Sequence, residues 1–410
     1  MEEKKERKMR DSGIPWIGEV PEGWEFSKIK YHCTMKSGDN ITALDISDNG
    51  EYPVYGGNGL RGFYKIYNKN GNHILIGRQG ALAGNVHLVN GKFWATDHAV
   101  IVTLKNDVFI NYFFRMLESM NLNQYAFDTA AQPGLSVSRI MNLNIVLPNL
   151  KEQHRIADFL GSKCSEIDTL IENLRARMES AKEYKKAVIT EAVTKGLDKD
   201  AKMKDSGVEW IGEIPEGWKV VRFKHIASIK SNLVQPDKYM KYPQIAPDNI
   251  EKDTGRLLSH QTVEESGVIS GNHLFYRGQI LYSKIRPNLN KLTVAPFDGL
   301  CSADMYPIES KLPTLFMVYS MLSTYFVSQV SLIIQDRVKM PKINQEELGE
   351  IKVAVPSQQE MLTIADYLDS KCSEIDALLQ NYEYQIATLE EYKKSLIYEY
   401  VTGKKEVPEA

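Results

Sequence analysis

The amino-acid sequence predicts an α+β protein, with two mixed α/β domains separated by two long antiparallel coiled-coil helices and an internal pseudo-twofold repeat. Three observations predict this fold. A turn-rich segment occurs twice, a helical segment occurs twice, and two blocks that are hard to align lie between these copies. A duplication that keeps its frame while its inserts diverge is typical of a fixed scaffold that presents two different domains.

The first repeated segment is rich in turns. Residues 9–30 return at 203–224, with 13 of 22 positions identical. Four of the five tryptophans of the chain lie in these copies: Trp16, Trp24, Trp210 and Trp218. The sequence Pro-Glu-Gly breaks regular structure, and flanking indole rings can pin an extended segment to a neighbour. We therefore interpret residues 1–24 and 201–218 as straps, each of which leads into the block that follows it.

The second repeated segment is helical. Two stretches within residues 156–194 return 208 residues later. Apolar residues spaced three and four apart predict one coiled-coil seam on each helix. The predicted seam residues are Ile167, Ile171, Leu174, Met178, Ala181, Tyr184, Val188 and Ala192 on the first helix, and Ile375, Leu379, Tyr382, Ile386, Leu389, Tyr392, Leu396 and Tyr400 on the second. Two equivalent helices, within 147–200 and 355–410, can bury these seams against each other. The first strap must then lie near the end of the second helix.

The two variable blocks are residues 25–146 and 219–354. In both, short β-type runs alternate with turns, and a helix is expected near 109–120 and near 312–326. The blocks carry net charges of +2 and +4, whereas residues 356–410 carry −6. The acidic helix therefore masks two mildly basic blocks in the net charge of −3 for the whole chain.

Composition and motifs exclude several classes of function. Four widely spaced cysteines read as reduced thiols, the charged N-terminus lacks a signal-peptide core, and no apolar stretch is long enough to span a bilayer. We therefore expect a cytoplasmic protein without membrane contact. The chain has no phosphate-binding GxxxxGK[ST] loop, no HExxH and no cysteine–histidine cluster with zinc spacing. We expect no catalytic centre, no metal and no cofactor in this chain.

This organisation resembles the specificity (S) subunits of type I restriction-modification systems over essentially the whole chain. The straps WIGExPEGW and the helix-leading segments LPNLKEQHRIADFL and VPSQQEMLTIADYL carry the resemblance. The stretches IGRQGALAGNVHLVNGKFWATDHAV and LYSKIRPNLNKLTVAPFDGLCSAD also look like target-recognition sequence of that family.

The resemblance implies that 25–146 and 219–354 are target recognition domains. Each would read one half of a bipartite, asymmetric site in double-stranded DNA. The helices would set the spacer between the half-sites and dock two methyltransferase (modification) subunits. Those partners would hold S-adenosylmethionine, and restriction/translocase subunits would hold ATP and magnesium.

Contacts with DNA need Lys or Arg for phosphates, and Arg, Lys, Asn or Gln for base edges. Candidates in the first block are Arg61, Lys65, Arg78, Gln79, Lys92 and Arg139. Candidates in the second block are Lys284, Arg286, Asn288, Asn290, Lys291, Arg337 and Lys339. Alternation along a strand places Lys284 and Arg286 on one face.

Two other functions stay open at this point. One is a stand-alone enzyme, which the missing motifs disfavour. Asp97 beside His98 and Asp158 near His154 suggest acid–base chemistry, but no nucleophile accompanies them, so we interpret them as structural. The other is a coiled-coil connector with protein-binding end domains, which would enrich no DNA sequence.

Overall fold

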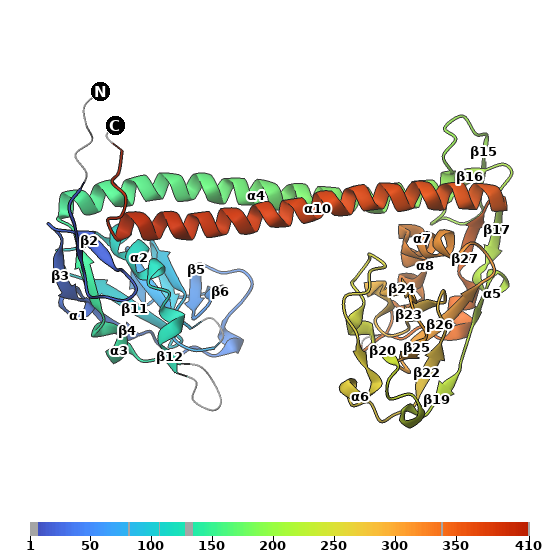
Figure 1. Cartoon of the computed structure of the whole chain (residues 1–410), viewed down its shortest axis with the longest axis horizontal. Helices are drawn as coiled ribbons and strands as arrows, with labels where there is room; N and C mark the ends of the chain where they lie inside the picture. Colours follow the sequence, from blue (N-terminus) through green and yellow to red (C-terminus); the bar gives the residue numbers. More distant parts are fainter. Residues whose placement is uncertain (1–6, 81–82, 106, 128–133, 338, 409–410) are drawn as a thin grey trace. The chain divides into compact units, whose positions relative to one another are not determined.

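The computed structural model describes residues 7–80, 83–105, 107–127, 134–337 and 339–408. The chain divides into two compact units. The first unit contains residues 1–174 and 384–410, and the second contains residues 175–383. Each unit holds one strap hairpin, one α/β domain and a part of both long helices, α4 (Leu150–Lys195) and α10 (Gln358–Val401) (Figure 1).

The first domain is built from two four-stranded sheets, a pair of end strands and short helices. Its elements are β3 (Glu25–Lys28), α1 (Ile29–His32), β4 (Cys33–Ser37), β5 (Tyr52–Gly56), β6 (Gly59–Tyr64), β7 (Lys69–Asn70), β8 (His73–Gly77), β9 (Val86–Val89), β10 (Lys92–Ala95), β11 (Ala99–Leu104), α2 (Ile110–Ser119), β12 (Ala126–Phe127), β13 (Gly134–Leu135), α3 (Val137–Met141) and β14 (Asn144–Leu147). The sheets have the orders β4-β11-β8-β9 and β6-β5-β10-β7, and β3 pairs with β14. Helix α2 lies where the sequence predicts a helix.

The second domain repeats this plan. Its elements are β17 (Lys219–Arg222), α5 (Phe223–Ile226), β18 (Ala227–Ile229), β19 (Leu233–Val234), β20 (Pro243–Ile245), β21 (Gln261–Thr262), α6 (Val263–Ser266), β22 (Asn272–Phe275), β23 (Ile280–Ser283), β24 (Leu292–Val294), β25 (Gly299–Cys301), β26 (Met305–Ser310), α7 (Thr314–Leu322), α8 (Thr324–Ile334), α9 (Gln345–Glu350) and β27 (Lys352–Val355). The order β18-β26-β23-β24 matches β4-β11-β8-β9 of the first domain, and β17 pairs with β27. The helix expected near 312–326 is instead two helices, which meet at 59° beside Ser323 and continue to Ile334.

Alternating side chains give the central sheet of each domain two apolar faces. In the first domain, Ile74 and Ile76 of β8 face the core that contains α2 and α4, whereas Leu75 faces the second sheet. In the second domain, Tyr282 of β23 faces the core beside α7 and α8, and Leu281 faces the other side. The two domains therefore bury equivalent strands in the same way.

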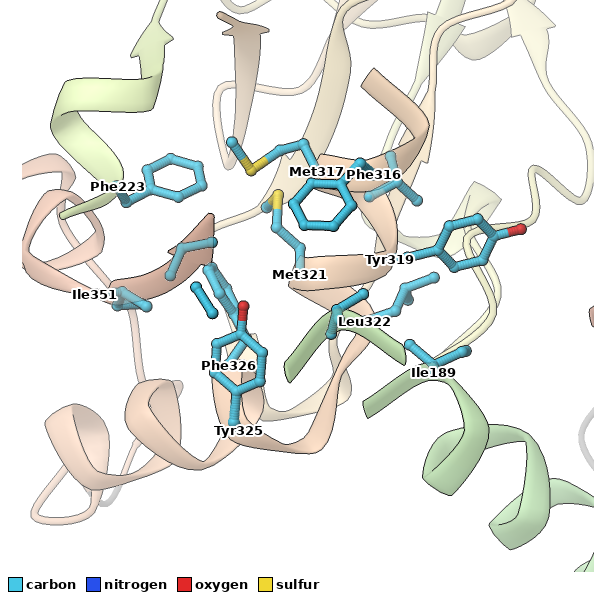
Figure 2. Close-up of a cluster of buried hydrophobic side chains, with 14 of the residues drawn as sticks. Ile189, Phe223, Phe316, Met317, Tyr319, Met321, Leu322, Tyr325, Phe326 and Ile351 are labelled. Carbon is cyan, nitrogen blue, oxygen red and sulfur yellow. The ribbon is translucent and has the colours of Figure 1, made fainter. Parts of the chain in front are cut away.

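The long helices belong to these cores. In the second unit, Ile189 of α4 belongs to the apolar core that also contains α7 and α8, and it lies beside Leu322 of α7 (Figure 2). In the first unit, Leu396 and Ile397 of α10 share a core with Ile167 and Ile171 of α4. Burying about 100 Å² of apolar surface is worth roughly 2.5 kcal/mol, so each domain stabilises the helix ends that it covers.

The strap hairpins are β1 (Met9–Asp11) with β2 (Glu19–Pro21), and β15 (Met203–Asp205) with β16 (Glu213–Pro215). Trp24 is 2% exposed and lies against Gly403, where an added Cβ would come 2.9 Å from its ring. Trp218 lies in the same way against Gly196, at 3.2 Å. Each strap therefore docks at the C-terminal end of a long helix, and the first strap meets the second helix as the closed repeat predicts.

Within each unit α4 and α10 run antiparallel. In the first unit the ring centroids of Phe159 and Tyr400 are 4.6 Å apart, and Lys393 binds Asp168. In the second unit Lys185 binds Asp376. In each of these pairs the two residue numbers add up to about 560. In antiparallel helices a constant sum means a constant alignment, so the register is the same in both units.

Two of the predicted seam residues are wrong. Tyr184 and Tyr392 are 54% and 55% exposed, and their neighbours Lys185 and Lys393 take the seam positions instead. A strict alternation of three and four, counted from Leu174, reaches residue 185 and not 184. A lysine can occupy such a position because its aliphatic stem packs in the seam while its ammonium group reaches a carboxylate at the edge.

No single helix of the described residues is long and apolar enough to cross a membrane. The bent pair α7 and α8 passes that test by length and composition alone, but most of its apolar side chains are buried in the core of the second domain.

Candidate nucleic-acid interface

The turn after β8 brings together several candidates of the first block. Arg78 and Gln79 follow the last residue of the strand, and both side chains are exposed. The Arg78 backbone N–H donates to the carbonyl of His98 at 2.9 Å, and its carbonyl accepts from the N–H of Leu135, also at 2.9 Å. Its guanidinium donates to the hydroxyl of Ser37 at 3.3 Å. The backbone of Arg78 is thus fixed on both sides while its side chain faces solvent.

Two glycines let a neighbouring segment approach this turn. A Cβ on Gly57 would lie 3.2 Å from the carbonyl oxygen of His98 and 3.6 Å from that of Gln79. A Cβ on Gly56 would lie 2.5 Å from the side chain of Arg61. The absence of side chains at both positions therefore places Arg61 beside the turn, and we call Arg61, Arg78, Gln79 and His98 the first turn cluster.

His98 is a member of this cluster that the sequence analysis treated as structural. Its Nδ1 lies 3.0 Å from the side-chain oxygen of Gln79, and Nε2 lies 3.9 Å from Asp97. The ring is exposed and sits beside two candidate contacts. The Asp97–His98 pair directly before the β-type run AVIVTL was the sequence signal that could have found it.

The turn after β23 is the equivalent place in the second domain. The N–H of Lys284 donates to the carbonyl of Asp304 at 2.9 Å, and its carbonyl accepts from the N–H of Ile343 at 3.0 Å. These bonds match those of Arg78 with His98 and Leu135. Lys284 and Arg78 therefore occupy one position of a shared framework, although the two blocks are hard to align by sequence.

Arg286 stands two residues after Lys284 in a left-handed conformation, with φ of +43°. Its N–H donates to the carbonyl of Pro341 at 2.7 Å, and its side chain is exposed. The corresponding position in the first domain is Gly80, with φ of +86°. Left-handed backbone is strained for an arginine and unstrained for glycine.

Of the asparagines in this turn, Asn288 is exposed, whereas Asn290 is 1% exposed. Asn290 has φ of +42°, and its amide donates to the carbonyl of Met321 at 3.0 Å. Asn290 therefore holds the turn against α7. Lys291 is half-buried and donates to the carbonyl of Pro247 at 2.8 Å, so it ties the turn to a neighbouring loop.

The segment at 339–342 lies beside this turn. The guanidinium of Arg337 binds the carboxylate of Glu347 and the carbonyl of Lys342. The hydrogen bond from Arg337 lowers the pKa of Glu347 below its ordinary value. Lys339 is exposed. Lys342, which the sequence analysis did not select, is exposed at 53% of its side chain and lies 3.1 Å from Asp304.

A buried histidine adjoins Lys284. His273 of β22 is 8% exposed, and within the described residues its Nδ1 has no hydrogen-bond partner. Burial lowers the pKa of His273, and the positive charge of Lys284 lowers it further. The ammonium of Lys284 also lies 5.4 Å from the ring centroid of Tyr306. We call Lys284, Arg286, Asn288 and Lys342 the second turn cluster.

The remaining candidates of the first block are spread more widely. The ammonium of Lys92 lies 4.8 Å from the ring centroid of Tyr67, and Lys65 is exposed directly after β6. Arg139 is on α3, which follows Leu135, and its guanidinium lies 5.5 Å from the ring of Tyr125. Arg139 is therefore on the helix that follows Leu135, whose N–H is bonded to Arg78, whereas Lys65 and Lys92 border the other sheet.

The described residues contain no group of three or more His, Cys, Asp or Glu side chains arranged to hold a metal ion. All four cysteines are buried thiols. Burial raises the pKa of Cys33 to about 12 and that of Cys372 to about 11, so these thiols are protonated at neutral pH.

Comparisons with known proteins identify relatives of the chain. Residues 21–180 match a family model described as the type I restriction modification DNA specificity domain. The type I restriction enzyme EcoDI specificity subunit of Escherichia coli is 34% identical over 267 residues, which cover 61% of this chain and 60% of that subunit. The chain thus spans about three fifths of the length of that relative.

Two further relatives extend over nearly the whole chain. The MjaVIII specificity subunit of Methanocaldococcus jannaschii is 28% identical over 423 residues, covering 94% of this chain and 93% of that one. A chain solved in work on the complex assembly and conformational transition of the type I R-M system has a similar fold, with a TM-score of 0.67 at 14% identity. That similarity covers 94% of this chain and 99% of that one. Both named relatives are specificity subunits of type I restriction enzymes, and this chain is similar to them in sequence and to the solved chain in fold.

Proposed function

We propose that this chain is the DNA sequence-recognition subunit of a type I restriction-modification enzyme. One observation carries the proposal: two domains of shared framework but different sequence present an exposed turn with a basic residue, Arg78 or Lys284, at the same position. Two domains that share a backbone framework but carry different turns could each recognise a different sequence, as a bipartite, asymmetric target requires. Residues 25–146 and 219–354 would each read one half-site.

The chemistry of the turn clusters suits both kinds of contact with DNA. Arginine and lysine bind phosphates, and a guanidinium can also bind the O6 and N7 atoms of guanine in the major groove. Gln79 offers both a donor and an acceptor, which suits adenine. The buried Asn290 and the engaged Arg337 would position the second turn, while Arg286 and Lys284 make contacts.

The experiment that tests recognition is selection from random DNA by the chain co-expressed with its methyltransferase partner. We expect enrichment of one sequence with two specific halves and an unread spacer. A structural connector would enrich no sequence. Methyl transfer by the chain alone, with S-adenosylmethionine and DNA, would favour a stand-alone enzyme instead.

The long helices would set the spacer. Helix α4 has 46 residues, which at 1.5 Å per residue is a length of about 70 Å. Inserting one heptad after Arg175 adds roughly 10 Å to that helix. We expect a longer spacer or lost activity, with unchanged half-site sequences. An active insertion variant that keeps the original spacer would contradict this role.

The helices would also dock the partner subunits. Some apolar residues that the sequence leaves outside the seam are covered, since Phe159 packs on Tyr400 and Tyr398 donates to the carbonyl of Ile17. Leu170 (52%) and Leu378 (41%) are exposed in matching places of the two repeats, as are Tyr184 (54%) and Tyr392 (55%), which the structure places outside the seam. Exposed apolar side chains repeated on a scaffold favour two equivalent docking faces.

Two methyltransferase subunits, which would hold S-adenosylmethionine, are the proposed occupants. Restriction/translocase subunits, with ATP and magnesium, would join that complex, while this chain supplies neither a catalytic centre nor a cofactor. Sedimentation of the co-expressed complex should give two methyltransferase copies for each copy of this chain. A 1:1 complex that methylates both half-sites would overturn the two-face model.

A further inference from the structure

Each coiled-coil seam contains one lysine in an otherwise apolar row. The seam of α4 passes from Ala181 through Lys185 to Val188, and that of α10 passes from Leu389 through Lys393 to Leu396. Both ammonium groups lie 2.7 Å from each of two carboxylate oxygens, Lys185 with Asp376 and Lys393 with Asp168. The lysine side chains are only 11% and 20% exposed. Each ammonium therefore depends on its carboxylate for a charged partner.

The carboxylates stand in a heptad row beside the seam, and this row differs between the helices. On α10 the row is acidic at four successive heptads: Asp369, Asp376, Glu383 and Glu390. On α4 the corresponding row has one acid between a glycine and two bases: Gly161, Asp168, Arg175 and Lys182. Displacing one helix by a heptad would therefore affect the two lysines differently.

Apolar seam residues cannot distinguish registers that differ by seven residues, because such a displacement places apolar residues opposite apolar residues again. The Lys185 pair cannot distinguish these registers either, because a displacement in either direction puts Asp369 or Glu383 in place of Asp376. The Lys393 pair can distinguish them. The same displacements put Gly161 or Arg175 in place of Asp168, which leaves its charge without a partner or opposite a like charge.

We propose that the Lys393–Asp168 pair determines the register of the two long helices, whereas the Lys185–Asp376 pair does not. A single polar residue in a coiled-coil seam is known to specify register at some cost in stability. Asp168 is thus a positioning residue. If the helices set the spacer, as proposed above, this one carboxylate also determines which spacer the chain accepts.

Cross-linking to a native cysteine tests the register in the full-length chain. Cys164 occupies a buried seam position, level with Leu396 in the observed register and with Leu389 after a displacement of one heptad toward Gly161. Under mild oxidation, the parent chain with Leu396→Cys should form the cross-link to Cys164, and the parent chain with Leu389→Cys should not.

The decisive variants move or remove the carboxylate. In the chain with Leu389→Cys, the further change Asp168→Asn should raise the yield of the cross-link to Cys164 about tenfold, the effect expected from losing one charge-assisted hydrogen-bonded pair. With both Gly161→Asp and Asp168→Asn, the cross-link between positions 389 and 164 should become the main product. The matched control is Lys185→Met, which loses the equivalent ion pair in every register and should therefore keep the Leu396→Cys cross-link alone. Circular dichroism would establish that all variants remain helical.

Two outcomes separate this inference from the function on which it rests. If the domain cores alone hold the helices, every helical variant will keep the parent cross-link, and the register proposal is overturned while recognition is unaffected. If the cross-link moves, the methylated spacer should change by about three base pairs, the span of one heptad along the duplex. A moved cross-link with an unchanged spacer would confirm the register pair and refute the role of the helices as a ruler.

Discussion

The turns after β8 and after β23 share a backbone framework but differ in how they hold their side chains. In the first domain Gly80 takes the left-handed position without strain, and the glycines at 56 and 57 give neighbouring backbone close access. In the second domain Arg286 takes that position, between Lys284 and Pro287. Left-handed backbone costs a non-glycine residue roughly 1–2 kcal/mol. A strained arginine with an exposed side chain supports the proposed contact of its guanidinium with DNA.

The turns also differ in how firmly they are fastened. Around the second turn, the N–H of Arg286 is bound by Pro341, Lys342 lies against Asp304, and Arg337 is bound to Glu347. Around the first turn, the side chain of Gln79 is held by the exposed ring of His98. Ion pairs therefore fasten the surroundings of the second turn. If the turns contact DNA as proposed, contacts that are held in place in this way would lose less entropy on binding.

The largest difference between the turns should appear when the basic residue at their equivalent position is removed. Arg78→Ala should weaken recognition of one half-site and Lys284→Ala that of the other, each by about 1–3 kcal/mol if the side chain reads a base. Binding to four DNAs, with either, both or neither half-site altered, would measure this. If either variant weakens both half-sites equally, the turns do not read separate halves.

Replacing Arg286 should show whether the strained backbone at this position serves to place its side chain against a DNA base. Arg286→Ala should cost about 1–3 kcal/mol and relax the choice of base at one position of the second half-site. If the guanidinium contacts only phosphate, affinity should fall evenly across sequences, and the salt dependence should decrease by about one unit of slope. Affinity that is unchanged at low and high salt would remove Arg286 from the interface.

Exchanging the residue at the left-handed position should affect stability in opposite directions. Gly80→Ala should destabilise the first domain by about 1 kcal/mol, because alanine is strained at φ of +86°. Arg286→Gly should leave the stability of the second domain unchanged or higher, because it relieves strain, while recognition of the second half-site is weakened. Thermal unfolding measures both. A loss of stability in Arg286→Gly would show that the side chain holds the fold.

The smallest effect should come from the ion pair that fastens the second turn. Because Arg337 lowers the pKa of Glu347, the pair stabilises the folded chain above the ordinary glutamate pKa, and this contribution is lost as the pH falls through the lowered value. Glu347→Gln should therefore be slightly less stable than the parent at pH 7, and the difference should shrink as the pH falls below the ordinary glutamate pKa. A difference that does not change with pH would exclude the ion pair as its cause.

The repeats carried most of what the sequence could predict. Identical straps and helical stretches indicate equivalent positions without any knowledge of the fold, and Trp24 and Trp218 indeed dock in equivalent ways. The helical seam was predicted with an error at Tyr184 and Tyr392. Apolar character alone favours the tyrosines at these places, whereas a strict heptad count falls on Lys185 and Lys393.

The candidate sites were harder to predict because they depend on tertiary contacts. Nothing in the sequence pairs Arg78 with Lys284, since the equivalence lies in backbone hydrogen bonds to His98 and Asp304. The burial of Asn290 depends on its contact with Met321, which is distant along the chain. Charge and residue type select candidates, but only the packing distinguishes an exposed contact residue from one that holds a turn.

The most direct test of two independent readers on one scaffold is a domain exchange. Residues 25–146 would be replaced by the corresponding domain of a relative with a different target, and the methylated motif would be sequenced in a host that carries the complete system. We predict that one half of the motif changes while the other half and the spacer stay the same. A motif in which both halves change together would contradict the account.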